Sequence, residues 1–283
     1  MQEVKSYKLQ NEICGYNKVT IEIGEICFVF RGDNYELMDL IKRKYNTFLS
    51  MKEPNFIIDV QVKKNIKLKE LRELKIISKK DKIFVFRWDF SGIIDFRRNE
   101  GELKLQEIEI EGVENFLRMC AGWLFPKYYE GILLHASSVI DSKEGFVFCG
   151  PSEAGKSTIA NLLKDDTILL TDEITLIRNI NRRYKIFGVP FWGMLWEEGN
   201  NVNISSEIKK IFLLKKDKDV YLKKLSPYKA VVEIMPNIIF FSHRSEISNK
   251  LFTLCCNLVE KIPCYELHFL PNKSFWRCIK NDQ

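Results

Sequence analysis

Residues 145–158 read GFVFCGPSEAGKST, an apolar run followed by a loop bounded by glycines. The segment from Gly150 to Thr158 fits the pattern G-x-x-x-x-G-K-[ST] in full. The apolar run predicts a strand over 145–149, and Lys156 opens a predicted helix over 156–163. Glycines let such a loop turn tightly and bring backbone N–H groups onto phosphate oxygens, and the helix N-terminus adds partial positive charge. The stretch therefore predicts a P-loop inside an α/β nucleotide-binding core.

The side chains of this segment have separate expected roles. Lys156 is expected to pair with the β- and γ-phosphates of ATP, and the Ser157 hydroxyl to bind Mg²⁺. The remaining residues expected to contact the nucleotide belong to the same segment: Gly150, Ser152, Glu153, Ala154, Gly155 and Thr158. Residues 150–155 are called the glycine loop.

Two acids, Asp172 and Glu173, directly follow the apolar run 168–170, and sixteen positions separate Lys156 from Asp172. That distance leaves room for one short helix and one return strand, so both carboxylates can reach the loop. Phosphoryl transfer needs a carboxylate to hold the metal and often one to accept a proton. We therefore expect a functional acid pair; the alternative is a surface turn with two solvated acids.

A histidine, His135, lies in the apolar stretch LLHA on the strand expected before the loop strand. By pattern alone, a single histidine on an apolar strand is more often a core residue with its hydrogen bonds satisfied than a catalyst. Both interpretations stay open on the residues alone.

The first part of the chain is expected to form a strand-rich N-terminal domain over 1–112, available for substrate docking, with a second domain over 113–283. Its predicted strands are 19–23, 27–30, 56–62, 83–88 and 103–110. A helix is expected over 33–49, with Asp33 or Asn34 as its N-cap, and another over 112–129, ending at Pro126 or shortly after.

The second part shows a different pattern, with strands and helices mixed. The predicted strands are 132–140, 145–149, 167–170, 175–178, 184–187, 209–214 and 265–269. The predicted helices are 156–163, 227–235 and 245–261. The fold class that follows is α/β with mixed sheets and attached antiparallel hairpins.

Composition limits the classes of partner and compartment. The formal net charge is +6, and the small lysine clusters are typical of solvated faces, so no nucleic-acid partner is expected. The N-terminus lacks the order of a secretory signal, and no apolar stretch reaches membrane-spanning length, so no membrane partner is expected. The eight cysteines show no paired spacing, which indicates reduced thiols and a cytoplasmic location.

Several stretches, taken in order, resemble the HPr kinase/phosphorylase superfamily, and in particular its shorter HPr kinase-like members. These are GILLHASSVI, GFVFCGPSEAGKST, ILLTDEITLIR and FGVPFWG, followed by EIKKIFLLKK, LSPYKAVVEI and KIPCYELHFLPN. The similar part covers residues 131–275. The chain differs from the family pattern at Glu153, where glycine is common, and at Glu173, where a second aspartate is typical. The glycine-containing signature of bifunctional HPr kinases has no clear counterpart, which argues against a phosphorylase activity and against HPr as substrate.

The resemblance implies a kinase core related in fold to phosphoenolpyruvate carboxykinase, with ATP and Mg²⁺ as cofactors. It implies that Asp172 is the base for the acceptor hydroxyl, that His135 tunes this carboxylate, and that Glu173 helps to hold the metal. Small members of the superfamily accompany the biosynthesis of ribosomally made peptides, including lasso peptides, and some phosphorylate a serine of the precursor.

The leading function is therefore an ATP-dependent kinase for a serine or threonine hydroxyl on a peptide or small protein. Two alternatives stay open: a kinase for small-molecule hydroxyls, and a nucleotide-sensing module without transfer. The sequence also leaves open whether the chain forms a homo-oligomer. The aromatic loop GVPFWG, residues 188–193, has two interpretations: Phe191 and Trp192 are core residues, or one of them lines the pocket.

Overall fold

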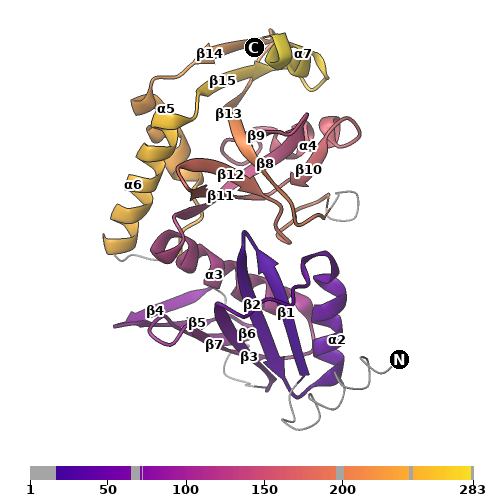
Figure 1. Ribbon diagram of the computed structural model, residues 1–283, viewed down its shortest axis with the longest axis vertical. Helices are drawn as coiled ribbons and strands as arrows, with labels where there is room; N and C mark the ends of the chain where they lie inside the picture. The colour runs from indigo at the N-terminus through magenta and orange to yellow at the C-terminus, as the bar shows by residue number, and fades with distance from the viewer. Residues whose placement is uncertain (1–16, 65–70, 72, 196–200, 242–244, 282–283) are drawn as a thin grey trace. The chain divides into compact units, whose positions relative to one another are not determined.

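The computed structural model describes residues 17–64, 71, 73–195, 201–241 and 245–281 (Figure 1). The chain forms two compact units, Met1–Cys120 and Ala121–Gln283. The division falls inside helix α3 (Ile110–Tyr128), beyond the boundary expected at 112. Each unit contains one mixed β-sheet, so the fold class is mixed α/β.

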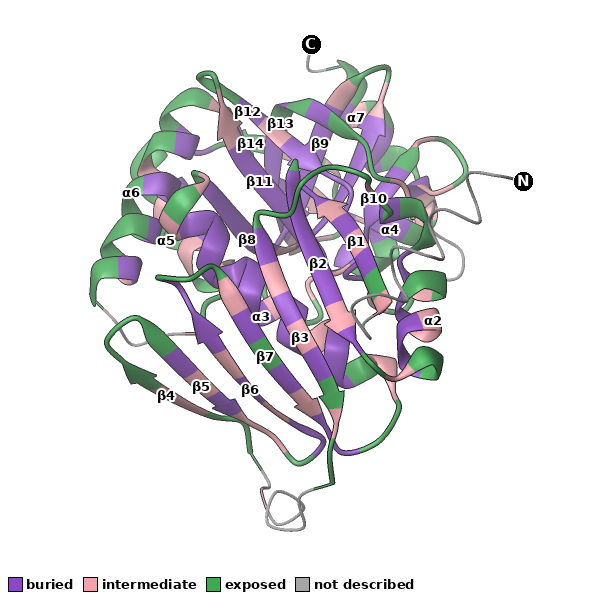
Figure 2. Ribbon diagram, turned by 60° about the horizontal axis from the view of Figure 1, so that its bottom comes forward, coloured by how far each residue is buried: buried purple, intermediate pink, exposed green. Residues whose placement is uncertain are grey.

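The N-terminal unit is a seven-stranded sheet in the order β1-β2-β3-β7-β6-β5-β4. The strands are β1 (Asn17–Ile23), β2 (Ile26–Gly32), β3 (Phe56–Val62), β4 (Lys75–Lys79), β5 (Lys82–Phe86), β6 (Phe90–Asp95) and β7 (Glu100–Leu105). β3 runs parallel to β2 and β7, and the other neighbours are antiparallel. Buried and partly exposed residues alternate along β3 and β5, as expected for strands whose two faces have different surroundings (Figure 2). A docking role for this unit remains a prediction.

Two predictions in this unit need correction. The helix expected over 33–49 is α2 (Tyr35–Lys44) followed by a short 3₁₀ turn (Asn46–Phe48). Asn34 is its N-cap, with Oδ1 accepting the Leu37 N–H at 2.9 Å. The strand expected over 103–110 ends at Leu105. Helix α3 already begins at Ile110 and continues past Pro126 to its last residue, Tyr128.

The C-terminal unit contains an eight-stranded sheet in the order β10-β8-β11-β12-β13-β15-β14, with β9 paired to β13 and β8. Its strands are β8 (Gly131–Asp141), β9 (Glu144–Cys149), β10 (Ile168–Thr171), β11 (Ile174–Ile180), β12 (Arg183–Phe187), β13 (Ser205–Lys216), β14 (Tyr221–Lys224) and β15 (Cys264–Phe269). β13 runs parallel to β9 and β15 and is antiparallel to β12. This strand therefore joins the hairpins of the unit to its parallel part.

Helices of the C-terminal unit are α4 (Lys156–Leu163), α5 (Pro227–Ile234), α6 (Ser245–Lys261) and α7 (Ser274–Asn281), with a 3₁₀ turn at Met235–Asn237. A core cluster joins apolar residues of α4 and α7 to β9, β13 and β15. In it Phe148 of β9 stacks on Phe212 of β13, with ring centroids 5.3 Å apart. The cluster holds α4 against the sheet, and so fixes the helix that follows the glycine loop.

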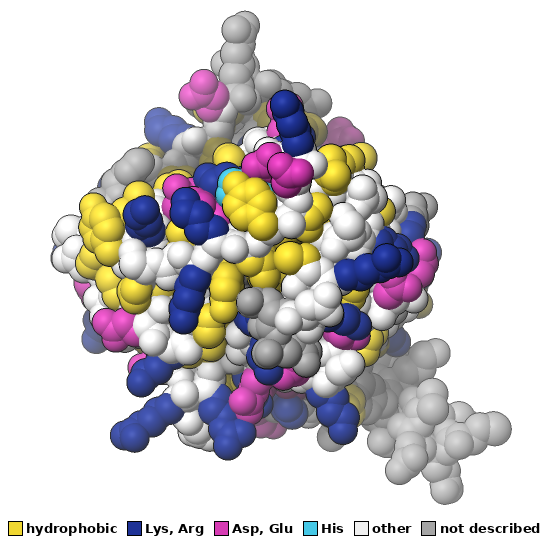
Figure 3. Space-filling model, turned by 90° about the horizontal axis from the view of Figure 1, so that it is seen from above, with side chains coloured by type: hydrophobic (Ala, Val, Ile, Leu, Met, Phe, Trp, Pro, Cys, Tyr) yellow, Lys and Arg dark blue, Asp and Glu magenta, His cyan; other side chains and the backbone are white. Residues whose placement is uncertain are grey.

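The helices, the thiols and the surface charges add three observations. None of the helices within the described ranges combines the length and the apolar character that a membrane crossing requires. The seven cysteines within those ranges are free thiols. On the face shown in Figure 3, Lys and Arg side chains are spread out, with acidic and apolar side chains between them. The absence of a nucleic-acid partner stays a prediction.

Candidate nucleotide site

The glycine loop connects the carboxyl end of β9 to the first turn of α4, as the sequence pattern predicts. Gly155 precedes the helix with φ +108°, in the left-handed region. A Cβ at this position would lie 2.7 Å from Cζ of Phe269 on β15. Both the backbone angle and the close approach therefore require glycine at the point where the loop enters α4.

Lys156 is folded back over the loop. Its Nζ donates to the carbonyl oxygens of Gly150 and Pro151, each at 2.9 Å, and the residue is only 7% exposed. Burial lowers the pKa of the ammonium group, whereas Cys149 and the Glu173 carboxylate raise it. The ammonium group is thus held at the centre of the loop by backbone oxygens.

Asp172 directly follows β10 and is 2% exposed. Its Oδ1 accepts the Gly193 N–H at 2.8 Å, and its Oδ2 accepts the Leu195 N–H at 3.2 Å. A Cβ at Gly193 would lie 3.0 Å from Asp172 Oδ2, so the loop approaches the carboxylate closely because this residue has no side chain. Asp172 is therefore not a solvated surface acid; it anchors residues 193–195.

The turn that carries the acid pair is fixed against β8. The Thr171 hydroxyl accepts the Glu173 N–H at 3.1 Å and the Ile174 N–H at 3.2 Å. The Ala136 N–H donates to the Glu173 carbonyl oxygen at 3.0 Å. In the antiparallel register Ile174 lies opposite His135. These hydrogen bonds hold β8, which carries His135, next to the turn that carries Asp172 and Glu173.

His135 is partly buried at this point. Burial lowers the pKa of its imidazole, and the positive charge of Lys156 lowers it further. The side chain is therefore held in its neutral form at neutral pH.

This pKa shift predicts a pH dependence of stability. Because the folded-state pKa lies below the unfolded value of about 6.5, the unfolded chain binds the proton more readily. Stability is then lost as the pH falls through that value. In urea unfolding between about pH 7.5 and pH 5.5, His135→Gln is expected to lose less stability than the wild type. The carboxylates titrate in both proteins, so parallel pH curves would contradict the burial effect.

A cavity of about 450 Å³ lies over the glycine loop and the first turn of α4. It is lined by nine residues that the sequence singled out: His135, Ser152, Glu153, Gly155, Lys156, Ser157, Thr158, Asp172 and Glu173. Three further residues line it: Gly193, Met194 and Lys216. The predicted contact residues Gly150 and Ala154 do not line it.

The three additional lining residues had weak or misleading signals in the sequence. Lys216 belongs to the pair Lys215-Lys216, a pattern typical of a solvated face, yet it is the last residue of β13 and pairs with β15. Met194 is 86% exposed and follows the aromatic loop rather than any recognised motif. Lys216 reaches the cavity because β13 pairs with β9 and β15. Met194 reaches it because Asp172 anchors residues 193–195.

The donors in this cavity fit a magnesium–phosphate group. Ser157, Asp172 and Glu173 offer hydroxyl and carboxylate oxygens, which are the ligands that Mg²⁺ takes in proteins. Within the described ranges no group of three or more His, Cys, Asp or Glu side chains could hold an ion by itself. A site with few protein ligands suits Mg²⁺, which keeps several waters and completes its shell with substrate phosphates.

The aromatic loop is part of the interior. Phe191 is fully buried, and its carbonyl oxygen accepts the Thr171 hydroxyl at 3.1 Å. Trp192 is 6% exposed and belongs to the core cluster with Leu195 and Trp276. Of the two interpretations of this loop, the structure supports the one in which Phe191 and Trp192 are core residues. The neighbouring Gly193 and Met194 line the cavity instead.

Trp192→Ala is accordingly expected to lower the free energy of unfolding by about 3–5 kcal/mol, as truncation of a core aromatic does. Urea unfolding measures this loss, and Trp88→Ala, at a 50% exposed site, is the control with an expected change of about 0.5 kcal/mol. Trp192→Phe should leave the tryptophan response to Mg·ADP unchanged. Loss of that response with little loss of stability would contradict the core assignment.

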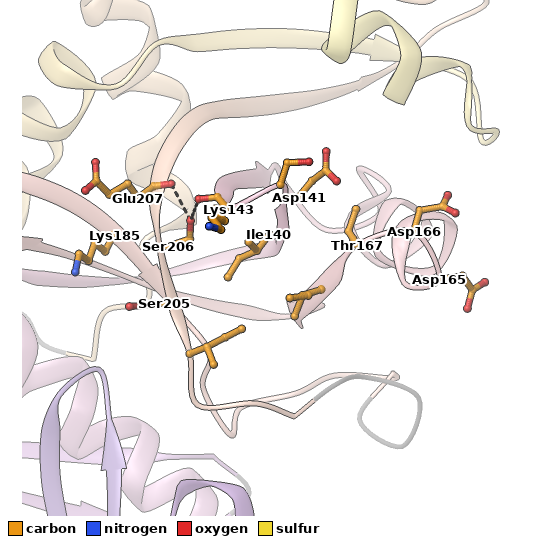
Figure 4. Close-up of a pocket in the computed structure, with 13 residues that line it drawn as sticks. Ile140, Asp141, Lys143, Asp165, Asp166, Thr167, Lys185, Ser205, Ser206 and Glu207 are labelled. Atoms are coloured by element: carbon orange, nitrogen blue, oxygen red, sulfur yellow. Dashed lines mark hydrogen bonds between the residues drawn. The ribbon is translucent and has the colours of Figure 1, made fainter.

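A larger cavity, about 740 Å³, lies at the opposite end of β9 (Figure 4). It surrounds the turn between β8 and β9, and Lys143, Lys185, Asp165 and Asp166 are among its charged lining residues. None of the predicted site residues lies there. Its mixed charges and its distance from the glycine loop make it a separate feature of the unit.

Comparisons with known proteins found one matching family model and similar solved structures. The family model described as "SynChlorMet cassette protein ScmC" matches residues 117–281. Among solved structures, the Hpr(Ser) kinase/phosphatase from Coxiella burnetii matches with 12% sequence identity and a TM-score of 0.33. That match covers 53% of this chain and 95% of the other chain. No curated protein matches the chain.

Proposed function

The chain belongs to the SynChlorMet cassette protein ScmC family, and we propose that it is an ATP-dependent phosphotransferase acting on a serine or threonine hydroxyl of a peptide or small protein. The observation that carries this proposal is the convergence of Lys156, Ser157, Asp172 and His135 on one cavity. Lys156 and Ser157 of α4 share one motif, whereas His135 of β8 and Asp172 at the end of β10 lie outside it and reach the cavity through the fold.

In the proposed reaction the acceptor hydroxyl oxygen bonds to the γ-phosphorus while the bond to the bridging oxygen of ADP breaks. Mg²⁺, held by oxygens of Ser157, Asp172 and Glu173, would supply positive charge against the phosphates. Lys156 exchanges its loop carbonyl partners for phosphate oxygens and stabilises the charge of the transferred group.

Asp172 accepts the proton of the acceptor hydroxyl in this proposal. Its two N–H partners, on Gly193 and Leu195, hold the carboxylate in one orientation and leave a lone pair on each oxygen for a further hydrogen bond. His135, neutral beside it, contributes no second positive charge to the site. The carboxylate is therefore fixed before the acceptor arrives.

A second candidate function has one observation in its favour. Asp172 is 2% exposed and both of its oxygens are engaged by the backbone, which also suits a purely structural anchor. The chain would then bind nucleotide without transferring phosphate. A kinase for a small-molecule hydroxyl is the third alternative, with the same residues in the same roles.

The test is to incubate the protein with Mg²⁺ and ATP labelled in the γ-phosphate, together with a library of serine- and threonine-containing peptides. Label in the peptide fraction supports the proposal. Label in a small-molecule fraction, after addition of a metabolite extract, identifies the small-molecule kinase. Binding of ATP with no label transferred to any acceptor contradicts the kinase proposal and favours the binding module.

A further inference from the structure

Glu153 has an unusual backbone for a glutamate. Its φ is +64°, in the left-handed region that residues with a side chain rarely adopt. Most other residues of this kind lie in turns between paired strands: Glu25, Lys80, Asn99, Ser142, Lys143, Asn181 and Arg182. Glu153 instead lies in the middle of the glycine loop, where glycine would adopt this angle freely. Its side chain is exposed and lines the cavity.

Glu153 is one of five charged side chains that line the cavity. The lining contains the carboxylates of Glu153, Asp172 and Glu173 and the ammonium groups of Lys156 and Lys216. The lining therefore carries one carboxylate more than it carries ammonium groups, and Glu153 is the carboxylate of the three that lies in the glycine loop.

Lys156 and Asp172 are hydrogen-bonded to the protein backbone. Lys156 donates to two loop carbonyls, and Asp172 accepts two backbone N–H groups. Within the described part of the chain Glu153 forms no ion pair, so its charge faces whatever enters the cavity. A polyphosphate without a metal would meet a carboxylate in the loop that should cradle it.

We propose that Glu153 makes the site selective for a nucleotide bound as its divalent-metal complex and discriminates against the free nucleotide. This inference rests on the proposed function, because it requires a nucleotide in this cavity. The metal cancels part of the phosphate charge, so the complex is repelled less by Glu153 than the free nucleotide is. Metal and nucleotide therefore bind with positive coupling, and Glu153 is a source of that coupling.

The test compares ATP dissociation constants, measured by calorimetry, with excess Mg²⁺ and with EDTA. Glu153→Gln removes the charge and keeps the size, and Glu153→Gly removes the charge and the left-handed side chain. Both variants are expected to bind ATP in EDTA about tenfold more tightly than the wild type, with a smaller change in Mg²⁺. Glu260→Gln, at an exposed position of α6, is the matched control and should leave both constants unchanged.

The two glutamate variants also separate charge from backbone strain. Thermal melting of the ligand-free proteins is expected to shift upward in Glu153→Gly but not in Glu153→Gln, because only glycine relieves the left-handed angle. Equal gains in EDTA affinity for the two variants then assign the effect to the charge. A gain in Glu153→Gly alone would overturn the electrostatic proposal.

Two further outcomes would overturn it. If the ratio of the ATP dissociation constants in EDTA and in Mg²⁺ is the same in Glu153→Gln as in the wild type, Glu153 does not discriminate against the free nucleotide. If Glu153→Gln loses ATP affinity only in the presence of Mg²⁺, Glu153 is a metal ligand. The failure of the proposed function has a different signature. If the wild type and every variant fail to bind ATP even with Mg²⁺, the cavity is not a nucleotide site, and both the proposed function and this inference are wrong.

Discussion

Lys156→Ala is expected to reduce ATP-dependent phosphoryl transfer by at least about a hundredfold, the usual cost of removing one group that stabilises transition-state charge. Lys156 is the only ammonium group at the centre of the glycine loop within the described residues, and its Nζ lies 2.9 Å from two loop carbonyl oxygens. Initial rates of ATP consumption with Mg²⁺ measure the effect.

The same change has a structural cost that the sequence did not indicate. A lysine at a loop mouth would contribute little to stability, but Lys156 is buried and donates two hydrogen bonds. We expect a loss of about 1.5–3 kcal/mol in the free energy of unfolding, the usual net contribution of a hydrogen bond that involves a charged group. Lys229→Ala, on the exposed surface of α5, is the control and should change neither quantity. Turnover at the wild-type rate in Lys156→Ala would remove the glycine loop from the mechanism.

Asp172→Asn is expected to reduce transfer by about 10²–10⁴-fold, the usual contribution of a general base. Its side chain keeps the shape of aspartate but not its hydrogen bonds. The single oxygen of the asparagine amide can accept the N–H of Gly193 or of Leu195. The NH₂ group would face the other N–H and cannot accept it, because both groups are donors. The variant therefore removes the proposed base and also releases one anchor of residues 193–195.

Three measurements separate these two effects. Hydrogen exchange at the amides of Gly193 and Leu195 reports the loss of the anchor, the affinity for Mg·ATP reports the cavity, and the rate of transfer reports the base. Glu173→Gln, at the next residue, is the comparison and is expected to raise the Mg²⁺ concentration needed for half-maximal rate. Transfer by Asp172→Asn at the wild-type rate would show that another residue accepts the proton.

Local patterns were sufficient for the elements whose signals lie within one stretch of chain. The bounds of β3, α4 and α6 agree with those predicted, because strand alternation and helical periodicity are complete within each segment. The glycine loop lies between a strand and a helix for the same reason. The N-cap at Asn34 is also a local feature, since it acts on an N–H three residues away.

Other elements were missed because distant partners stabilise them. β14 (Tyr221–Lys224) has only four residues and is a strand because β15 pairs with it. α7 (Ser274–Asn281) is short, and it is held by Phe275, Trp276 and Ile279 in the core cluster. β4 and β6 were likewise not predicted, since their signals depend on pairing with β5. Short segments of this kind have no decisive pattern of their own.

The candidate site divides in the same way. The sequence by itself determined the glycine loop, Lys156 and Ser157, because their spacing is dictated by one strand, one turn and one helix. Only the tertiary structure decided that the Gly193 and Leu195 N–H groups bind Asp172, which lies 21 and 23 residues earlier, and that Lys216 lines the cavity. Such contacts depend on the pairing and packing of several strands, and a linear pattern carries no record of which distant backbone groups a carboxylate will meet.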